Sequence, residues 1–284
     1  MNNFDLVMLK CPVCGAKMYQ KNEKNLSCEG IRVHSYDISA SGYVNLASPK
    51  QCGGGDNKDA VRARTAFLDL DYYLPIVNKT TEMLKKFVST DKKVIDAGCG
   101  EGYYTCKIAE SGFFTIGFDI SKVAVETAAK RAKRDKICNT AFMVASVYEL
   151  PIFNLFAGAI VNVFAPCVES EYTRVLDDDG ILLVVHAGKN HLMGLKQQIY
   201  DKIYENDERA DLPKEMELLE EESLSYEISV KGNQNIKNLF AMTPYYWRTS
   251  LDDTKKLDNL EELQTQIDII FSIFKKKVDG KENG

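Results

Sequence analysis

Short apolar runs alternate with amphipathic stretches through the middle of the chain. The runs are rich in β-branched residues and predict strands, while apolar positions spaced by three and four residues predict helices between most of them. The predicted strands are residues 93–97, 114–119, 141–145, 157–163 and 181–187, and the predicted helices are residues 102–111, 121–134 and 169–176. Strands separated by helices imply right-handed crossovers, and therefore an α/β fold with a parallel, doubly wound sheet.

The segments on either side of this block have different patterns. Apolar faces at residues 60–68 and 74–87 predict two helices, and the acidic stretch 192–222 is predicted to be mainly helical. Alternating segments at residues 226–230 and 266–274 predict a closing antiparallel pair, which would complete a seven-stranded, mostly parallel, Rossmann-like sheet.

Three regions are expected along the chain. Residues 1–48 are rich in cysteine and turns and are too short to hold a core without a staple. Residues 49–90 form a helical linker, and residues 91–284 form the main α/β domain. The chain has no internal repeat and no low-complexity tract.

Charge changes this picture only slightly. The net charge is −5, but residues 205–222 alone carry nine carboxylates against two basic residues, so the rest of the chain is slightly positive. This balance permits an RNA partner without requiring one. Residues 1–10 lack a signal-peptide core, and the apolar run 157–165 is too short to span a bilayer, so no membrane role and a cytoplasmic location are expected.

A glycine-rich turn follows the first strand of the α/β block. The sequence Asp96-Ala-Gly98-Cys-Gly100-Glu-Gly102 places glycines where a backbone must approach a ligand closely. Its G-x-G-x-G spacing, with a preceding carboxylate, differs from the G-x-G-x-x-G turn that receives a pyrophosphate. A carboxylate suits a zwitterionic amino acid that carries an extra cation, as in S-adenosylmethionine.

A second acidic residue supports this interpretation. Asp119 ends the next predicted strand, about twenty residues further on, where a carboxylate can bind both ribose hydroxyls. The competing interpretation is an ordinary strand–turn–helix with a solvated Asp at each strand end. Because both elements occur together, a nucleoside site is favoured.

The N-terminal region carries a metal-binding pattern. Cys11-Pro-Val-Cys14 is followed by Cys28 and His34, and three thiolates with one imidazole complete a tetrahedron for a structural Zn²⁺. Cys52 is the competing fourth ligand; His34 is favoured because Cys52 lies in a glycine-rich loop. The remaining cysteines, Cys99, Cys106, Cys138 and Cys167, are expected to be small buried residues.

A zinc knuckle ahead of such a fold resembles the bacterial large-subunit rRNA guanine-N1 methyltransferases over nearly the whole chain. The resemblance rests on the metal-binding pattern, the two acidic strand ends and several short motifs. These motifs are Gly42-Tyr-Val-Asn-Leu46, Gly55-Asp56, Ala63-Arg-Thr-Ala-Phe-Leu68, Asp119-Ile-Ser-Lys122, Ala165-Pro-Cys167, His191-Leu-Met193 and Met242-Thr-Pro-Tyr-Tyr-Trp-Arg248.

The resemblance implies a class I S-adenosylmethionine-dependent methyltransferase with a small N-terminal zinc-binding domain that helps to recognise a 23S rRNA hairpin loop. By matched position, Tyr73, Gly100, Glu101 and His191 would contact the cofactor. Ser146 lies where such folds hold the adenine.

Two departures from the family pattern bear on the site. The spacing between Cys28 and His34 is longer than usual, and Asn162 replaces an expected basic residue near the acceptor. We expect the acceptor base over residues 162–166, with Asn162, Phe164 and Pro166 as the acceptor-side positions and Trp247 or Arg248 nearby. No residue stands out as a general base.

Two other functions remain open. A small-molecule methyltransferase would keep the glycine turn and Asp119 but would not need a zinc knuckle, and a non-catalytic RNA-binding protein could keep the fold alone. The intact glycines at 98, 100 and 102 argue against the second. The target guanine and the oligomeric state stay open, a homodimer included.

Overall fold

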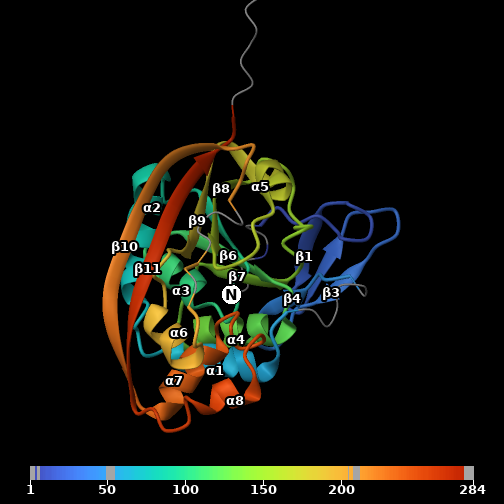
Figure 1. Cartoon of the computed structure of the whole chain (residues 1–284). Helices are drawn as coiled ribbons and strands as arrows, with labels where there is room; N and C mark the ends of the chain where they lie inside the picture. The colour runs from blue at the N-terminus through green and yellow to red at the C-terminus, as the bar shows by residue number, and fades with distance from the viewer. Residues whose placement is uncertain (1–3, 5–6, 49–54, 204, 207–211, 278–284) are drawn as a thin grey trace, which may run out of the picture.

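The computed structural model describes residue 4 and residues 7–48, 55–203, 205–206 and 212–277, and Figure 1 shows their arrangement. A mixed eight-stranded sheet forms the centre of the molecule, with helices and a smaller three-stranded sheet around it. Within the described residues, no helix is long and apolar enough to cross a membrane.

The centre of the large sheet is parallel, as the sequence predicts. The strands β5 (Lys93–Ala97), β6 (Phe114–Asp119), β7 (Thr140–Val144), β8 (Ala157–Val163) and β9 (Leu176–Ala187) run in the order β9-β8-β5-β6-β7. Because β5 and β6 are neighbours in parallel register, with Asp96 opposite Gly117, the carboxyl ends of both strands meet at one edge. The two acidic strand ends therefore lie at the same edge of the sheet.

Two long antiparallel strands complete the sheet. β11 (Glu262–Lys275) pairs with β9, and β10 (Glu217–Lys231) forms the outer edge beside β11. The predicted pair is confirmed, but both strands extend well beyond their predicted bounds. The prediction of a mainly helical 192–222 stretch is wrong, because α6 (Met193–Ile199) is the only helix among the described residues of this stretch and β10 already begins at Glu217. Pairing along the whole of β11 outweighs the helix propensity of the glutamates.

An eighth strand comes from the N-terminal region. β4 (Tyr43–Asn45) adds to the seven expected strands and lies parallel to β7 at the opposite edge from β10. The strands β1 (Met18–Asn22), β2 (Asn25–Cys28) and β3 (Ser35–Asp37) form the separate small sheet. The predicted domain boundary at residue 48 stays a prediction. The segment before it supplies all three strands of the small sheet and one strand, β4, of the large sheet.

Helices cover one face of the large sheet, and the N-terminal module covers part of the other. α2 (Leu74–Phe87), α3 (Tyr103–Glu110) and α4 (Lys122–Arg134) follow one another on the first face. On the second face, α5 (Glu169–Val175) and the N-terminal module share one apolar cluster with β5 and β6. The module thus replaces a helix layer, and its Leu9 bridges to Ile152 of the main domain.

The remaining helices gather beyond the carboxyl ends of the strands. α1 (Lys58–Leu68) contacts α7 (Asn233–Ala241), and α8 (Leu251–Lys255) lies beside them in Figure 1. The α1 helix begins where the Asn57 side chain accepts a hydrogen bond from the Ala60 N–H at 2.9 Å. Arg64 of α1 lies next to Gly100, so α1 lies beside the glycine turn.

Candidate active site and metal centre

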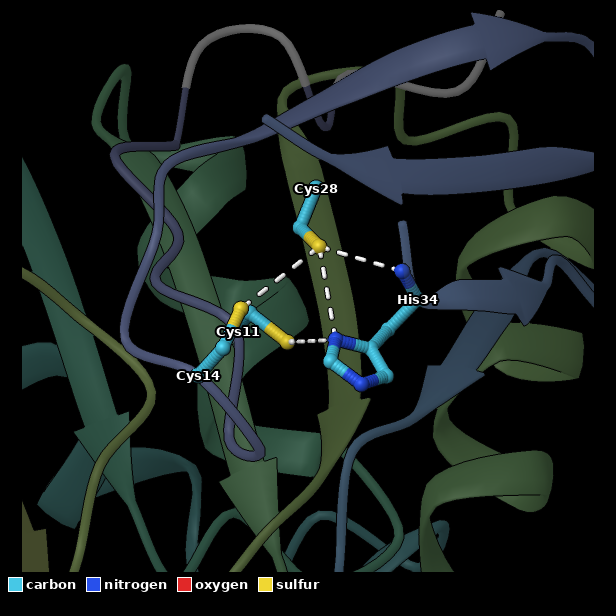
Figure 2. A group of neighbouring side chains, drawn as sticks. All are labelled: Cys11, Cys14, Cys28 and His34. Carbon is cyan, nitrogen blue, oxygen red and sulfur yellow. Dashed lines mark hydrogen bonds between the residues drawn. The ribbon is translucent and has the colours of Figure 1, made fainter. Parts of the chain in front are cut away.

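The four predicted metal ligands converge in the structure. The ligand atoms of Cys11, Cys14, Cys28 and His34 all lie within 4.8 Å of one another (Figure 2). The Cys14 and Cys28 sulfurs are 3.7 Å apart, and the His34 Nδ1 is 3.5 Å from the Cys28 sulfur and 3.6 Å from that of Cys11.

These separations match a tetrahedral zinc site. With Zn–S near 2.3 Å and Zn–N near 2.05 Å, a tetrahedron has edges of about 3.8 Å between sulfurs and about 3.6 Å between sulfur and nitrogen. The His34 N–H also donates to the Cys28 sulfur at 3.1 Å, and this bond is the main cause that lowers the pKa of Cys28 to about 6. The Cys₃His group therefore fits a closed, structural Zn²⁺ site. The competing ligand Cys52 lies outside the described residues.

The Tyr36 hydroxyl borders this cluster, 3.4 Å from the Cys11 sulfur. Sequence analysis missed Tyr36, since a single tyrosine in a short strand carries no spacing signal. A hydroxyl beside a thiolate ligand can orient it, as outer-shell groups do at other metal sites.

The glycine turn lies at the carboxyl end of β5, with all three glycines at positive φ. A Cβ built on Gly98 would lie only 2.6 Å from the Ala165 Cβ, so no other residue fits there without movement of the 165 loop. Gly100 differs, because the nearest atom to its added Cβ is the Arg64 Nη1 at 3.5 Å. The turn is thus closed at Gly98 and more open at Gly100.

Asp119 is positioned by the turn and by the segment after β6. Its two carboxylate oxygens accept hydrogen bonds from the Gly100 N–H at 3.0 Å and the Ser121 N–H at 2.8 Å. Ser146 lies just beyond β7, on the same edge, where its hydroxyl accepts a bond from the Tyr148 N–H at 3.2 Å. The predicted ribose and adenine residues are therefore at neighbouring strand ends.

The acidic groups of the turn are deeply buried. The Asp96 carboxylate accepts a bond from the Thr105 hydroxyl at 2.5 Å, yet burial raises the Asp96 pKa to about 7. Burial also raises the pKa of Glu101 and of Asp119. Closely spaced carboxyls in an apolar setting favour a positively charged ligand, since a cation would offset their burial cost.

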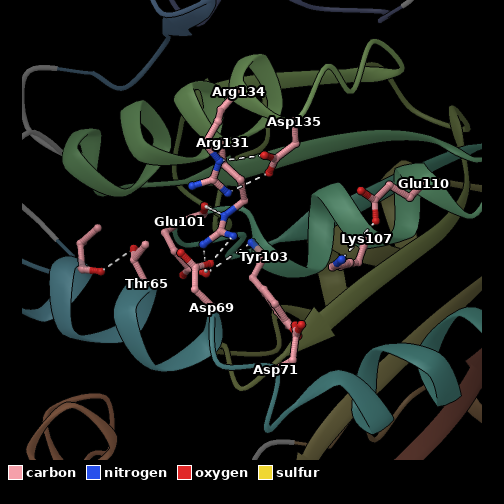
Figure 3. Close-up of polar contacts among 11 residues, drawn as sticks. Thr65, Asp69, Asp71, Glu101, Tyr103, Lys107, Glu110, Arg131, Arg134 and Asp135 are labelled. Atoms are coloured by element: carbon pink, nitrogen blue, oxygen red, sulfur yellow. Dashed lines mark hydrogen bonds and ion pairs between the residues drawn. The ribbon is translucent and has the colours of Figure 1, made fainter. Parts of the chain in front are cut away.

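Arg131 of α4 supports Glu101 from behind the turn (Figure 3). Its guanidinium donates to the Glu101 carbonyl at 3.3 Å and pairs with Asp69 at 2.6 Å, and the residue is only 7% exposed. Tyr103 makes a parallel link, donating to Asp71 at 3.0 Å. In the sequence Arg131 lies among other basic residues of a predicted helix, which is typical of a solvated face, whereas the structure buries it as a link between the turn and the end of α1.

Three aromatic rings gather at the end of β8. Phe164 stacks on His191 with ring centroids 5.8 Å apart, and Tyr73 lies 6.4 Å from Phe164 and 6.3 Å from His191. From the sequence alone, Tyr73 would be taken for an ordinary core residue and His191 for a surface residue. Only the family resemblance indicates that both lie in a cofactor site. The structure brings them together and buries both.

His191 has a defined protonation state. Its Nδ1 accepts a hydrogen bond from the Asp268 N–H at 3.3 Å, which places the ring proton on Nε2. Burial lowers the pKa of His191 to about 3, so the ring is neutral throughout the physiological range. Sequence analysis missed Asp268, because it binds His191 through its main-chain N–H and its residue type therefore gives no indication of this role.

The three acceptor-side positions differ in their exposure and in their hydrogen bonds. Asn162 is buried and its amide donates to the Pro166 carbonyl at 3.0 Å and to the Tyr172 hydroxyl at 3.1 Å, so its side chain shapes the turn. Phe164 is 46% exposed and has φ of 51°, an uncommon conformation for a bulky residue. Pro166 is also exposed. The role of all three in acceptor binding stays a prediction.

The fold and these residues together define the class of protein. The glycine cradle, the ribose-type carboxylate at β6 and the buried acidic groups fit S-adenosylmethionine, and residues 89–265 match the family model described as "Methyltransferase domain". The chain is an S-adenosylmethionine-dependent methyltransferase by fold and family.

Three relatives narrow the family. The chain is 32% identical to the 23S rRNA (guanine(748)-N(1))-methyltransferase of Streptomyces fradiae over 192 residues, which cover 66% of each protein. It is 30% identical to a putative 23S rRNA (guanine-N(1)-)-methyltransferase of Micromonospora griseorubida, over 67% of this chain and 69% of that protein. A third relative of the same description, from Bacillus subtilis (strain 168), is 26% identical over 93% of this chain and 96% of its own length. The chain belongs to the 23S rRNA (guanine-N1)-methyltransferase family.

Proposed function

We propose that this protein transfers the methyl group of S-adenosylmethionine to N1 of a guanine in a hairpin loop of 23S rRNA, in the cytoplasm. The family membership supports the reaction, and the exposed Phe164 beside the cofactor turn is the single observation that carries the acceptor placement. A splayed base can stack on an exposed aromatic ring, and loop bases are the ones that proteins reach in folded RNA.

The methyl donor has a very good leaving group, so the protein mainly supplies proximity and alignment. Asp119 and the glycine turn would hold the nucleoside, and His191 can donate a hydrogen bond from Nε2. His191 does not serve as the base for the guanine N1 proton, because its remaining nitrogen already accepts the Asp268 N–H. Burial raises the pKa of Tyr73, so this ring also stays protonated at neutral pH.

Trp247 offers a second exposed aromatic surface. Trp247 is 66% exposed and packs edge-on against Tyr246, at 5.0 Å between centroids. The adjoining Tyr245 hydroxyl donates to the side-chain oxygen Oδ1 of Asn206 at 2.9 Å, and the side-chain amide nitrogen of Asn206 donates to the His191 main-chain carbonyl at 3.1 Å. These bonds join the 245–247 segment to His191, whose ring stacks on Phe164, and this connection supports Trp247 as a platform for a base next to the acceptor.

The direct test is methylation of the RNA. Reverse transcription across 23S rRNA should stop one nucleotide before a modified guanine in cells that make the protein, because an N1 methyl blocks base pairing, and the stop should vanish when the gene is deleted. Mass spectrometry of the digested rRNA should identify the methylguanosine. Identical rRNA from both strains, with methylation of a small molecule instead, would favour the small-molecule alternative.

The acceptor placement is tested by Phe164→Ala with Phe164→Tyr as its matched control. Loss of a stacking surface is worth about 1 to 3 kcal/mol per base, so kcat/KM for rRNA should fall roughly 5- to 150-fold in the alanine variant. The tyrosine variant should keep most activity. S-adenosylhomocysteine affinity, measured by calorimetry, should change little; an alanine variant with full rRNA methylation would refute the placement.

A further inference from the structure

The charge around the glycine turn leaves one part of the cofactor without an evident partner. Asp96, Glu101 and Asp119 all lie at or beside the turn, and burial raises the pKa of each. These groups suit the sulfonium and ammonium of S-adenosylmethionine. Its methionine carboxylate, however, would meet like charge, which is unfavourable unless a cation is placed nearby.

Arg64 is a cation on the open side of the turn. Its Nη1 is the nearest atom to a Cβ built on Gly100, at 3.5 Å, and its charge acts to lower the pKa of both Glu101 and Asp119. The side chain is 24% exposed, so a ligand can reach it. Arg131 also approaches the turn but is already engaged with Asp69 and the Glu101 carbonyl.

The Arg64 guanidinium has a carboxylate partner within the protein. Arg64 forms an ion pair with Asp56, in the short segment that precedes α1. This segment rests on the end of β6, since the Ser121 hydroxyl donates to the Asp56 carbonyl at 2.7 Å and a Cβ on Gly55 would lie 3.0 Å from the Ser121 nitrogen. Asp56 therefore presents its carboxylate to Arg64 beside the ribose residue Asp119.

We propose that Arg64 binds the methionine carboxylate of the cofactor, and that Asp56 holds the guanidinium in place until the cofactor arrives. The planar guanidinium recognises a carboxylate through two parallel hydrogen bonds, a geometry that a lysine does not reproduce. Exchange of one carboxylate partner for another keeps the guanidinium neutralised in both states. The inference rests on the same methyl donor as the proposed function, S-adenosylmethionine.

The test removes the carboxylate from the ligand as well as the arginine from the protein. Calorimetry on the full-length, zinc-loaded protein compares S-adenosylhomocysteine with methylthioadenosine, which keeps the nucleoside and sulfur but lacks the amino acid. In Arg64→Gln the Kd for S-adenosylhomocysteine should rise about 10-fold or more, since a hydrogen-bonded charge pair is lost. The Kd for methylthioadenosine should stay within about twofold, because that ligand has no carboxylate to lose.

Two control variants sharpen the test. Arg62→Gln removes an exposed arginine from the same helix and should leave both affinities unchanged. Asp56→Asn removes the competing carboxylate and should leave S-adenosylhomocysteine binding equal or tighter. Equal weakening of both ligands by Arg64→Gln, or of neither, would overturn the role of Arg64. If the wild-type protein bound neither ligand, the proposed cofactor itself would be wrong.

Discussion

The metal centre and the cofactor turn prepare for a positive charge in opposite ways. At the metal centre, a backbone N–H stabilises the thiolate of Cys28 and lowers its pKa to about 6. At the turn, burial raises the pKa of Asp96 to about 7. The ionised carboxylate is therefore unfavourable there unless a cation lies beside it. The comparison indicates a permanent ion at the first site and an exchangeable one at the second.

The two regions also differ in how they are assembled. All four metal ligands come from one short part of the chain, residues 11–34. The predicted cofactor site combines the turn with Tyr73 and His191, which are far apart in sequence and are brought together with the acceptor-side Phe164 only by the fold. Disruption of the first site should therefore affect the stability of the module, whereas disruption of the second should affect mainly ligand binding.

The largest effect is expected from Cys28→Ser. The buried Cys28 touches two other ligand atoms, so its loss should abolish stoichiometric zinc and lower the free energy of unfolding by about 4 kcal/mol or more. Zinc content by mass spectrometry and denaturant unfolding measure the two effects. Cys52→Ser is the matched control and should keep its zinc; loss of zinc there would make Cys52 a ligand in place of His34.

A smaller effect separates two neighbouring glycines. Gly98→Ala should lower the free energy of unfolding by about 3 kcal/mol, because its methyl group would collide with Ala165 and φ is 84°. Gly100→Ala meets no such obstacle and should cost only about 1 kcal/mol of stability. Its methyl group lies on the open side of the turn, so cofactor affinity should fall instead. Equal loss of stability in both variants would contradict the closed and open sides assigned here.

The smallest effect is the pH dependence of cofactor binding. Because the pKa of Asp96 is raised in the folded protein, its burial destabilises the folded state increasingly as pH rises through about 4 to 7. A bound cation favours the ionised carboxylate, so cofactor binding offsets this penalty and releases the carboxyl proton. Affinity for S-adenosylmethionine should therefore increase about 3- to 10-fold from pH 6 to pH 8. Calorimetry in buffers of different ionisation enthalpy measures the released proton. Asp96→Asn should bind more weakly and without this dependence; an unchanged pH profile would assign the proton to another group.

A truncation that separates the zinc module from the main domain would also damage the large sheet. Removal of residues 1–48 would delete β4, which pairs with β7 as an edge strand of the main domain. It would also remove apolar side chains such as Leu9 and Leu26 from a cluster shared with β5 and β6. Point substitution of the metal ligands is therefore the cleaner probe of RNA recognition.

Much of the site follows from local sequence, and the errors have identifiable causes. The C-x-x-C knuckle and the glycine turn combine residue type with short spacing, so their geometry is nearly fixed by the backbone between them. The long β10 strand was expected to be partly helical, because its glutamates favour helix while its pairing partner, β11, is distant in the chain. Arg131 looks like a solvated cation in sequence but finds Asp69 only in the folded protein.

By itself, the sequence determined the alternation of strands and helices between residues 93 and 187, the spacing of the cysteine and histidine pattern, and the two acidic strand ends, since each depends on periodicity or on spacing over a few residues. Only the tertiary structure decided that β4 joins the main sheet, that His191 is a neutral hydrogen-bond donor, and that Arg64 faces the open side of the turn. These features depend on contacts between residues that are remote along the chain. Burial and partner geometry, which set their chemistry, exist only once those segments have packed together.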